Sequence, residues 1–126
     1  MKSFIKKIML INPPVTRPKD FSSEVLRVSI FFPLGLAYIA ATLERTGKYE
    51  INVIDALAEC DLSKSTPIEG GSFLRYGFTD DEVAQKIIDY SPDVIGTSCL
   101  FSATQPDMAN ICRIAKKIDK NIITIV

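Results

Sequence analysis

The side chains that most often carry enzymatic chemistry are sparse in this sequence. It contains no histidine, and its three cysteines, Cys60, Cys99 and Cys112, stand at irregular intervals. These facts exclude the usual zinc ligand sets, the Ser-His and Cys-His nucleophile pairs and any Cys-x-x-Cys metal clip. An odd cysteine count also argues against a disulfide framework, so we expect reduced thiols. Cys112 falls on an apolar helical stripe, which predicts a core residue.

The carboxylates of the sequence also give little indication of a catalytic site. Asp55 ends a predicted strand and is the candidate general base, but one carboxylate without a partner is weak support for an enzyme acting alone, and a strand-end Asp usually caps a loop. The acids of residues 80–82 follow Thr79 in a Thr-x-x-Glu capping box, for which a structural role suffices.

Composition limits the remaining classes. A chain of 126 residues with 47% hydrophobic and 24% charged residues has room for one domain with one core. The 15 basic and 15 acidic residues cancel, so no global field favours nucleic acid or an anionic membrane, and we expect neither as a partner. No apolar run approaches the roughly 20 residues that span a bilayer, and no signal peptide is recognisable, so we expect a cytoplasmic location.

Short apolar runs alternate with helical patterns along the chain. Strands are predicted at residues 8–12, 49–56, 93–98 and 122–126, and helices at residues 34–45, 79–91 and 104–118. This alternation predicts an α/β fold, a Rossmann-like (flavodoxin-like) doubly wound parallel sheet of four strands with right-handed crossovers. The first run stops at Asn12-Pro13-Pro14 and is expected to be the central strand.

Two long connections follow the first two strands, at the sheet edge where open α/β sheets bind ligands. Residues 15–32 and 57–78 are predicted to lack regular structure for most of their length. The apolar residues 28–32 are expected to fold back as a cover over the site. Residues 72–77 are expected either to face a substrate as a flap or to pack on a neighbouring domain.

Three common ligand sites of such folds are missing. A dinucleotide site or a P-loop needs glycines after the first strand so that backbone amides approach phosphate, but Asn12-Pro13-Pro14 has no glycine and removes amides. A phosphate-accepting receiver domain needs an Asp at the end of the third strand, where this chain has Gly96-Thr97-Ser98.

Four segments together resemble a known family. They are Ile11-Asn12-Pro13-Pro14, residues 33–41 with Leu43-Glu44, Val53-Ile54-Asp55-Ala56, and residues 92–98. Their order and spacing resemble the amino-terminal cobalamin-binding domains of radical S-adenosylmethionine enzymes, a group that includes methyltransferases and the oxidative cyclase acting on magnesium-protoporphyrin monomethyl ester.

The resemblance implies that cobalamin lies across the carboxyl ends of the strands, with its nucleotide tail entering the sheet. Ser98-Cys99-Leu100 matches the Ser-x-Leu turn that lines the tail pocket in such domains. The cofactor contacts expected from the resemblance are Asn12, Pro13, Pro14, Ser98, Leu100 and Thr104. The alternative for Ser98 is a polar strand end that caps the next helix.

The sequence departs from the family pattern in two places. The Asp-x-His-x-x-Gly turn that supplies a lower cobalt ligand is absent, so base-off cobalamin without a His ligand is expected. The Gly-Gly turn expected after the fourth strand would lie beyond Val126. We therefore expect residues 1–126 to be an N-terminal fragment of a longer multidomain enzyme, truncated before a fifth strand.

No Cys-x-x-x-Cys-x-x-Cys motif is present, so no catalytic site is expected in these residues. S-adenosylmethionine and the [4Fe-4S] cluster would belong to a downstream catalytic domain, the expected partner. The alternative is a degenerate Rossmann-like interaction module that binds no cofactor. In either case an exposed terminal strand favours self-association.

Overall fold

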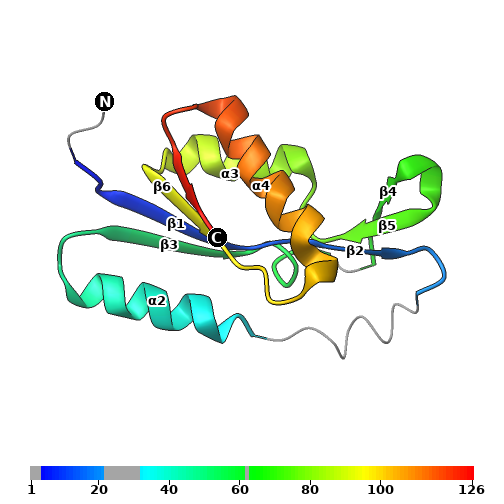
Figure 1. The fold of residues 1–126 in the computed structure, drawn as a ribbon, viewed down its shortest axis with the longest axis horizontal. Helices are drawn as coiled ribbons and strands as arrows, with labels where there is room; N and C mark the ends of the chain where they lie inside the picture. The colour runs from blue at the N-terminus through cyan, green and yellow to red at the C-terminus, as the bar shows by residue number, and fades with distance from the viewer. Residues whose placement is uncertain (1–3, 22–31, 62) are drawn as a thin grey trace.

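Two β-sheets of different kinds meet in this domain (Figure 1). The computed structural model describes residues 4–21, 32–61 and 63–126. The elements are, in chain order, β1 (Lys7–Asn12), β2 (Val15–Pro18), α2 (Leu34–Arg45), β3 (Glu50–Asp55), β4 (Thr66–Ile68), β5 (Phe73–Tyr76), α3 (Asp80–Tyr90), β6 (Val94–Thr97), α4 (Gln105–Ile118) and β7 (Ile123–Ile125), with 3₁₀ turns at Glu69–Gly71 and Ser102–Thr104.

The larger sheet is parallel, and its strand order is β3-β1-β6-β7. Helix α2 covers one face, and helices α3 and α4 cover the other (Figure 1). The predicted doubly wound parallel sheet is therefore confirmed. Strand β1 has a neighbour on each side, as expected for the central strand; Ile11 pairs with Ile54 of β3 and with Thr97 of β6.

Both faces of the parallel sheet are apolar because helices cover both. Met9, Ile11 and Ile95 point toward α3 and α4 and are almost completely buried. The alternate residues Ile8 and Leu10 pack toward α2. This alternation across a buried strand explains why the sequence shows an unbroken apolar run rather than a period of two.

The helices begin and end where their local sequences predict. In α3 the Thr79 hydroxyl accepts a hydrogen bond from the Glu82 amide, and the Glu82 carboxylate accepts one from the Thr79 amide, so the predicted capping box is confirmed. In α4, Ile111 and Ala115 are buried as expected, whereas the predicted core residue Cys112 is only half-buried.

Residues 15–32 and 57–78 contain short strands that the sequence did not predict, although those strands occupy only part of each segment. Strands β2, β5 and β4 form a three-stranded antiparallel sheet beside the carboxyl ends of the parallel strands (Figure 1). The predicted flap, residues 72–77, is strand β5 in the middle of this sheet. Of the expected cover at residues 28–32, residues 28–31 lie outside the described residues and Phe32 is exposed.

Candidate functional site

A cavity of about 220 Å³ lies where β1 and β6 end and β2 begins. The polar and apolar residues that line it are Asn12, Pro13, Val15, Arg17, Leu57, Ser98, Leu100, Phe101 and Thr104. We call it the edge cavity. It opens at the carboxyl edge of the parallel sheet, the position where the topology of open α/β folds creates a ligand crevice.

The edge cavity brings together five of the six residues that the sequence suggested as cofactor contacts. Pro14 is the exception. It is buried and packs against Gly77, because a Cβ built at Gly77 would lie 2.8 Å from the Cβ of Pro14. Pro14 is therefore beside Gly77, just after β5, and is not among the residues that line the cavity.

A chain of hydrogen bonds orients the amide of Asn12. The Ser98 hydroxyl donates to Asn12 Oδ1 at 3.3 Å, and Asn12 Nδ2 donates to Asp55 Oδ1 at 2.9 Å. Asp55 also accepts from the amides of Leu57 and Ala58, so it caps the loop after β3, and its own amide donates to the Glu59 carboxylate at 2.6 Å. Ser98 therefore bonds across to β1, and the alternative that it caps α4 is wrong, because no side chain caps that helix.

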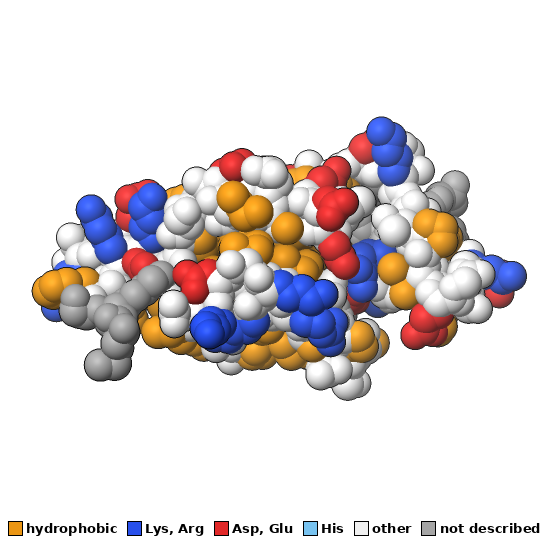
Figure 2. Space-filling view, turned by 90° about the horizontal axis from the view of Figure 1, so that it is seen from above, with side chains coloured by type: hydrophobic (Ala, Val, Ile, Leu, Met, Phe, Trp, Pro, Cys, Tyr) orange, Lys and Arg blue, Asp and Glu red, His pale blue; other side chains and the backbone are white. Residues whose placement is uncertain are grey.

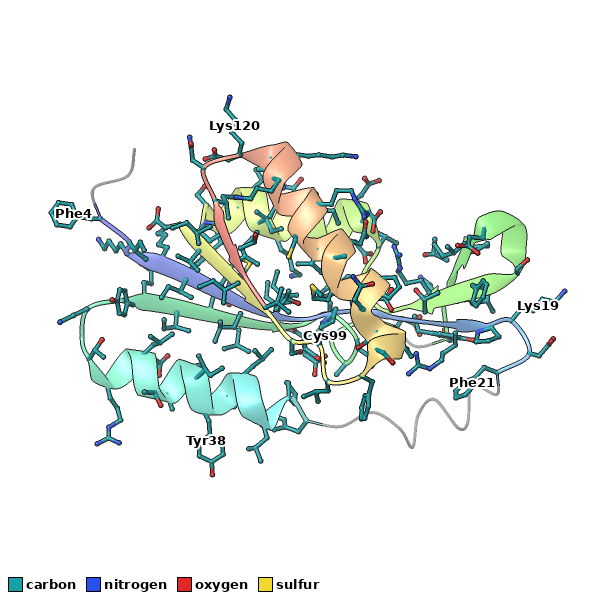
Figure 3. All side chains as sticks on the ribbon, in the orientation of Figure 1. Phe4, Lys19, Phe21, Tyr38, Cys99 and Lys120 are labelled. Carbon is teal, nitrogen blue, oxygen red and sulfur yellow. The ribbon has the colours of Figure 1, made fainter. Side chains whose placement is uncertain are left out.

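The loop between β6 and α4 forms the outer wall of the edge cavity. Thr104 Oγ1 donates to the Phe101 carbonyl at 2.8 Å and lies 3.8 Å from the Cys99 sulfur. Figure 3 labels Cys99 in this loop, beside the start of α4. Leu100 and Phe101 are 84% and 66% exposed, so they present apolar surface that this domain does not itself cover.

Four lining residues were not among the cofactor contacts predicted from the sequence: Val15, Arg17, Leu57 and Phe101. Among the described residues that line the cavity, Arg17 is the cationic side chain. Its Nη1 donates to the Thr16 carbonyl at 3.0 Å, which holds the guanidinium close to β2. The alternation of Val15 and Arg17 around Thr16 was the available signal, but a run of four residues ending in proline is too short to read as a strand.

A second cavity of about 340 Å³ lies on the α2 face of the parallel sheet, and we call it the α2 groove. Its lining is mostly apolar and includes Leu10, Leu36, Ile39, Gly96 and Ile125. Gly96 keeps the floor low, because a Cβ there would lie 2.8 Å from Leu10 Cδ2.

Thr97 lines the groove beside Gly96, but side chains alternate along β6, so its hydroxyl lies on the face of Ile95. The residue is 4% exposed, and within residues 4–21, 32–61 and 63–126 its Oγ1 is the buried side-chain oxygen or nitrogen atom that has no hydrogen-bond partner. Such an atom costs about 1–3 kcal/mol when it is left unpaired. Because Thr97 lines the groove and the next residue, Ser98, lines the edge cavity, the two cavities approach each other at the end of β6.

Other candidate chemistry is weak in the described part of the chain. Burial raises the pKa of the Cys60 thiol, which donates to the Leu57 carbonyl and is therefore a poor nucleophile. The described residues contain no cluster of three or more His, Cys, Asp or Glu side chains suited to a metal ion. Among them, no helix has the length and apolar character needed to cross a membrane.

Comparison with known proteins identifies the family. A family model described as the B12 binding domain matches residues 27–126. A curated relative, the cytidylyl-2-hydroxyethylphosphonate methyltransferase of Streptomyces wedmorensis, is 34% identical over 120 residues. That alignment covers 94% of this chain but 21% of the relative, so the chain spans about a fifth of the relative's length. No solved structure matches. Since the family model covers most of the chain, the protein belongs to the B12 binding domain family.

Proposed function

We propose that this chain is the cobalamin-binding domain of a longer cobalamin-dependent radical S-adenosylmethionine methyltransferase. Membership of the B12 binding domain family supports the cofactor, and the similarity to a methyltransferase supports the reaction. S-adenosylmethionine and the iron–sulfur cluster would be bound by a catalytic domain elsewhere in the same polypeptide. This domain contributes binding, orientation and exclusion of water, as proteins generally do for cofactors that carry the difficult chemistry.

The observation that carries the proposal is the mostly apolar α2 groove, which approaches the edge cavity at the end of β6. Cobalamin ends in a dimethylbenzimidazole base, an apolar ring with nitrogen acceptors. An apolar groove fits such a base, since Leu10, Leu36 and Ile39 would cover the ring.

The edge cavity fits the corrin end of the same molecule. A corrin ring is a broad apolar macrocycle fringed with carboxamides, which need donors and acceptors. Leu57, Leu100 and Phe101 offer apolar contact, and Asn12, Ser98 and Thr104 offer hydrogen bonds. The adjacency of Thr97 and Ser98 lets one ligand span both cavities, with the tail in the groove and the ring at the edge of the sheet.

Cobalt would receive no imidazole from this domain, because the sequence contains no histidine. We therefore infer binding with the benzimidazole released from cobalt and held in the α2 groove. When bound, cobalamin supplies a cobalt-centred carrier for methyl transfer. The side chains of the α2 groove would hold the tail, and those of the edge cavity would contact the corrin ring.

Visible-absorption titration with hydroxocobalamin tests this proposal, on this chain and on the full-length polypeptide. Saturable binding with a base-off spectrum is expected. The absence of saturable binding to both proteins overturns the proposal and leaves the alternative, an interaction module that binds no cofactor.

Substitution of Gly96 tests whether the α2 groove holds the nucleotide tail. Gly96→Val places a side chain on the floor of the groove, where a Cβ already meets Leu10 Cδ2, so we expect the affinity for cobalamin to fall about tenfold. Cobinamide, which lacks the nucleotide tail, should bind the native and the substituted protein equally. Thr42→Val on the exposed face of α2 is the control and should leave both affinities unchanged. Equal losses of affinity for cobalamin and cobinamide would contradict the placement of the tail in the groove.

Substitution in the turn after β6 tests the predicted contacts. Ser98→Ala combined with Leu100→Ala should weaken cobalamin binding without unfolding the domain, because both side chains line the edge cavity and Leu100 is largely exposed. Circular dichroism checks the fold. Unchanged affinity in a protein that binds cobalamin would exclude these two residues from the site.

A further inference from the structure

One buried carboxylate lies outside the proposed cofactor contacts. Asp107, in the first turn of α4, is 2% exposed. Among the described residues it is the buried side chain that carries a charge. Its Oδ1 accepts from the Thr16 hydroxyl at 2.6 Å, and its Oδ2 accepts from the Thr16 amide at 3.0 Å. Arg75 Nε lies 3.4 Å from Oδ1. A buried charge needs such partners, because an unpaired one would be very costly.

The Asp107 carboxylate contacts two neighbouring strands at one register position. Thr16 of β2 and Arg75 of β5 are register partners in the antiparallel sheet, and Arg75 Nε also lies 3.3 Å from Thr16 Oγ1. Arg75 Nη1 in turn pairs with Asp80 at 3.0 Å, and Asn110 of α4 donates to Asp80 at 2.8 Å. The network therefore fixes the second sheet against the starts of α3 and α4.

The residues on either side of Thr16 belong to the edge cavity. Side chains alternate along a strand, so Val15 and Arg17 leave β2 on the face opposite to Thr16. Both line the edge cavity together with Thr104, which directly precedes α4. A carboxylate on α4 that holds Thr16 consequently sets the separation between two walls of that cavity, one on β2 and the other at the start of α4.

We propose that Asp107 is a positioning residue of the cobalamin site. It locks β2 onto α4, so that Val15 and Arg17 form a fixed wall before the cofactor arrives. A pre-formed wall strengthens binding because less ordering is required when the ligand binds. This inference rests on the proposed cobalamin function, and it assigns a role to β2, which lies outside the residues matched by the family model.

The charge-neutral variant Asp107→Asn keeps the size of the side chain, but it removes the charge that faces Arg75 and replaces Oδ2, which accepts from the Thr16 amide, by a donor. We expect its affinity for hydroxocobalamin to fall about tenfold, within the range of coupling measured between residues of one network. Asp80→Asn is the matched control. It removes the 56% exposed partner of the same Arg75 and leaves the bonds to Thr16 intact, so the affinity should stay within about twofold.

A double-mutant cycle separates positioning from general destabilisation. Arg17→Gln alone should weaken hydroxocobalamin binding about fivefold, whereas in the Asp107→Asn background it should have little further effect, because the wall is already displaced. Dissociation constants are measured in the full chain, well below the unfolding midpoint of each variant. Additive effects of the two substitutions would contradict the inference, as would an Arg17→Gln protein with unchanged affinity.

Thr16→Val is the second variant, for use if Asp107→Asn does not fold. It removes the hydroxyl bond to Asp107 and keeps the amide bond, so we expect a smaller loss of affinity and the same lack of additivity with Arg17→Gln. Failure of the native protein to bind hydroxocobalamin would overturn the proposed function together with this inference. Binding by the native protein with unchanged affinity in the Asp107 and Thr16 variants would overturn the positioning role alone.

Discussion

The parallel sheet of this domain buries apolar side chains on both of its faces, whereas the antiparallel sheet rests on one small apolar cluster and a buried ion pair. Met9, Ile87 and Ile95 are completely buried in the first. In the second, Leu57 and Tyr76 form the buried cluster, and Asp107 and Arg75 make the charged contact. Burial drives the parallel sheet together, and directional bonds determine how the antiparallel sheet lies against it.

The two sheets therefore depend on interactions of different kinds. Apolar burial is non-directional and roughly proportional to area, so it supplies stability without fixing a single orientation. Hydrogen bonds and ion pairs are directional, and a satisfied buried network specifies one arrangement. We therefore expect substitutions in the parallel sheet to change global stability and substitutions around the antiparallel sheet to change local order near the edge cavity.

The largest effect is expected from the core of the parallel sheet. Ile95→Ala leaves a cavity between β6 and the helices α3 and α4, and should lower the free energy of unfolding by about 3 kcal/mol. Chemical denaturation measures this change. Ile123→Ala on the outer strand β7, where the side chain is 45% exposed, should cost under about 1 kcal/mol. Equal costs at the two sites would mean that the core does not dominate stability.

An intermediate and more local effect is expected at the junction of the two sheets. Gly77 has φ +120°, and a Cβ there would lie 2.6 Å from the Ala56 carbonyl oxygen. Gly77→Ala should therefore cost about 2 kcal/mol of strain. Hydrogen exchange should show faster exchange in β2 and β5 and little change in β1 and β6.

Gly47→Ala provides the control for Gly77, since its φ is also positive, at +67°, but nothing lies within 4 Å of the added carbon. It should cost less and leave exchange in β2 and β5 unaltered. Uniform loss of protection across both sheets in Gly77→Ala would contradict the view that the antiparallel sheet opens separately.

The smallest effect is expected at the cap of α3. Thr79→Ala removes the hydroxyl that accepts from the Glu82 amide and should cost about 1 kcal/mol. Thermal unfolding measures it, and Thr79→Ser, which keeps the hydroxyl, should recover most of the loss. If Thr79→Ala also displaced β5 in hydrogen exchange, α3 and the antiparallel sheet would act as one unit, and the contrast between the two regions would be weaker.

The parts of the fold that could be predicted are those that local sequence determines. Strands β1, β3 and β6 are apolar runs bounded by breakers, and α3 has its own capping box, so each element is legible within its own window. Mixed positive and negative side chains over the face of α3 and α4 likewise agree with the balanced charge of the sequence (Figure 2).

The antiparallel sheet could not be predicted because its pairing is not local. Thr16 and Arg75, whose side chains contact across β2 and β5, are 59 positions apart, and β2 and β4 contain Pro18 and Pro67, which locally indicate loops. The burial of Asp107 could not be predicted for the same reason. An acid in the first turn of a helix normally faces solvent, and its burial depends on a strand that the sequence does not announce.

The exposure of some apolar side chains also could not be predicted from the sequence. Tyr38 points away from the sheet on the outer side of α2 (Figure 3), and Leu100 and Phe101 rim the edge cavity. No single local pattern distinguishes such exposed positions from core positions, because both are apolar. The burial of Leu36 and the exposure of Tyr38, two positions further along the same helix, depend on the face that meets the sheet.

The bond from Thr16 to Asp107 joins residues separated by 91 positions, and this separation has a consequence for how the protein is made. A ribosome delivers β2 long before α4, so the strand must wait for most of the domain to emerge before its buried partner exists. Contacts of such long range form late in folding. A nascent chain therefore cannot fix the β2 wall of the edge cavity until Asp107 has been synthesised.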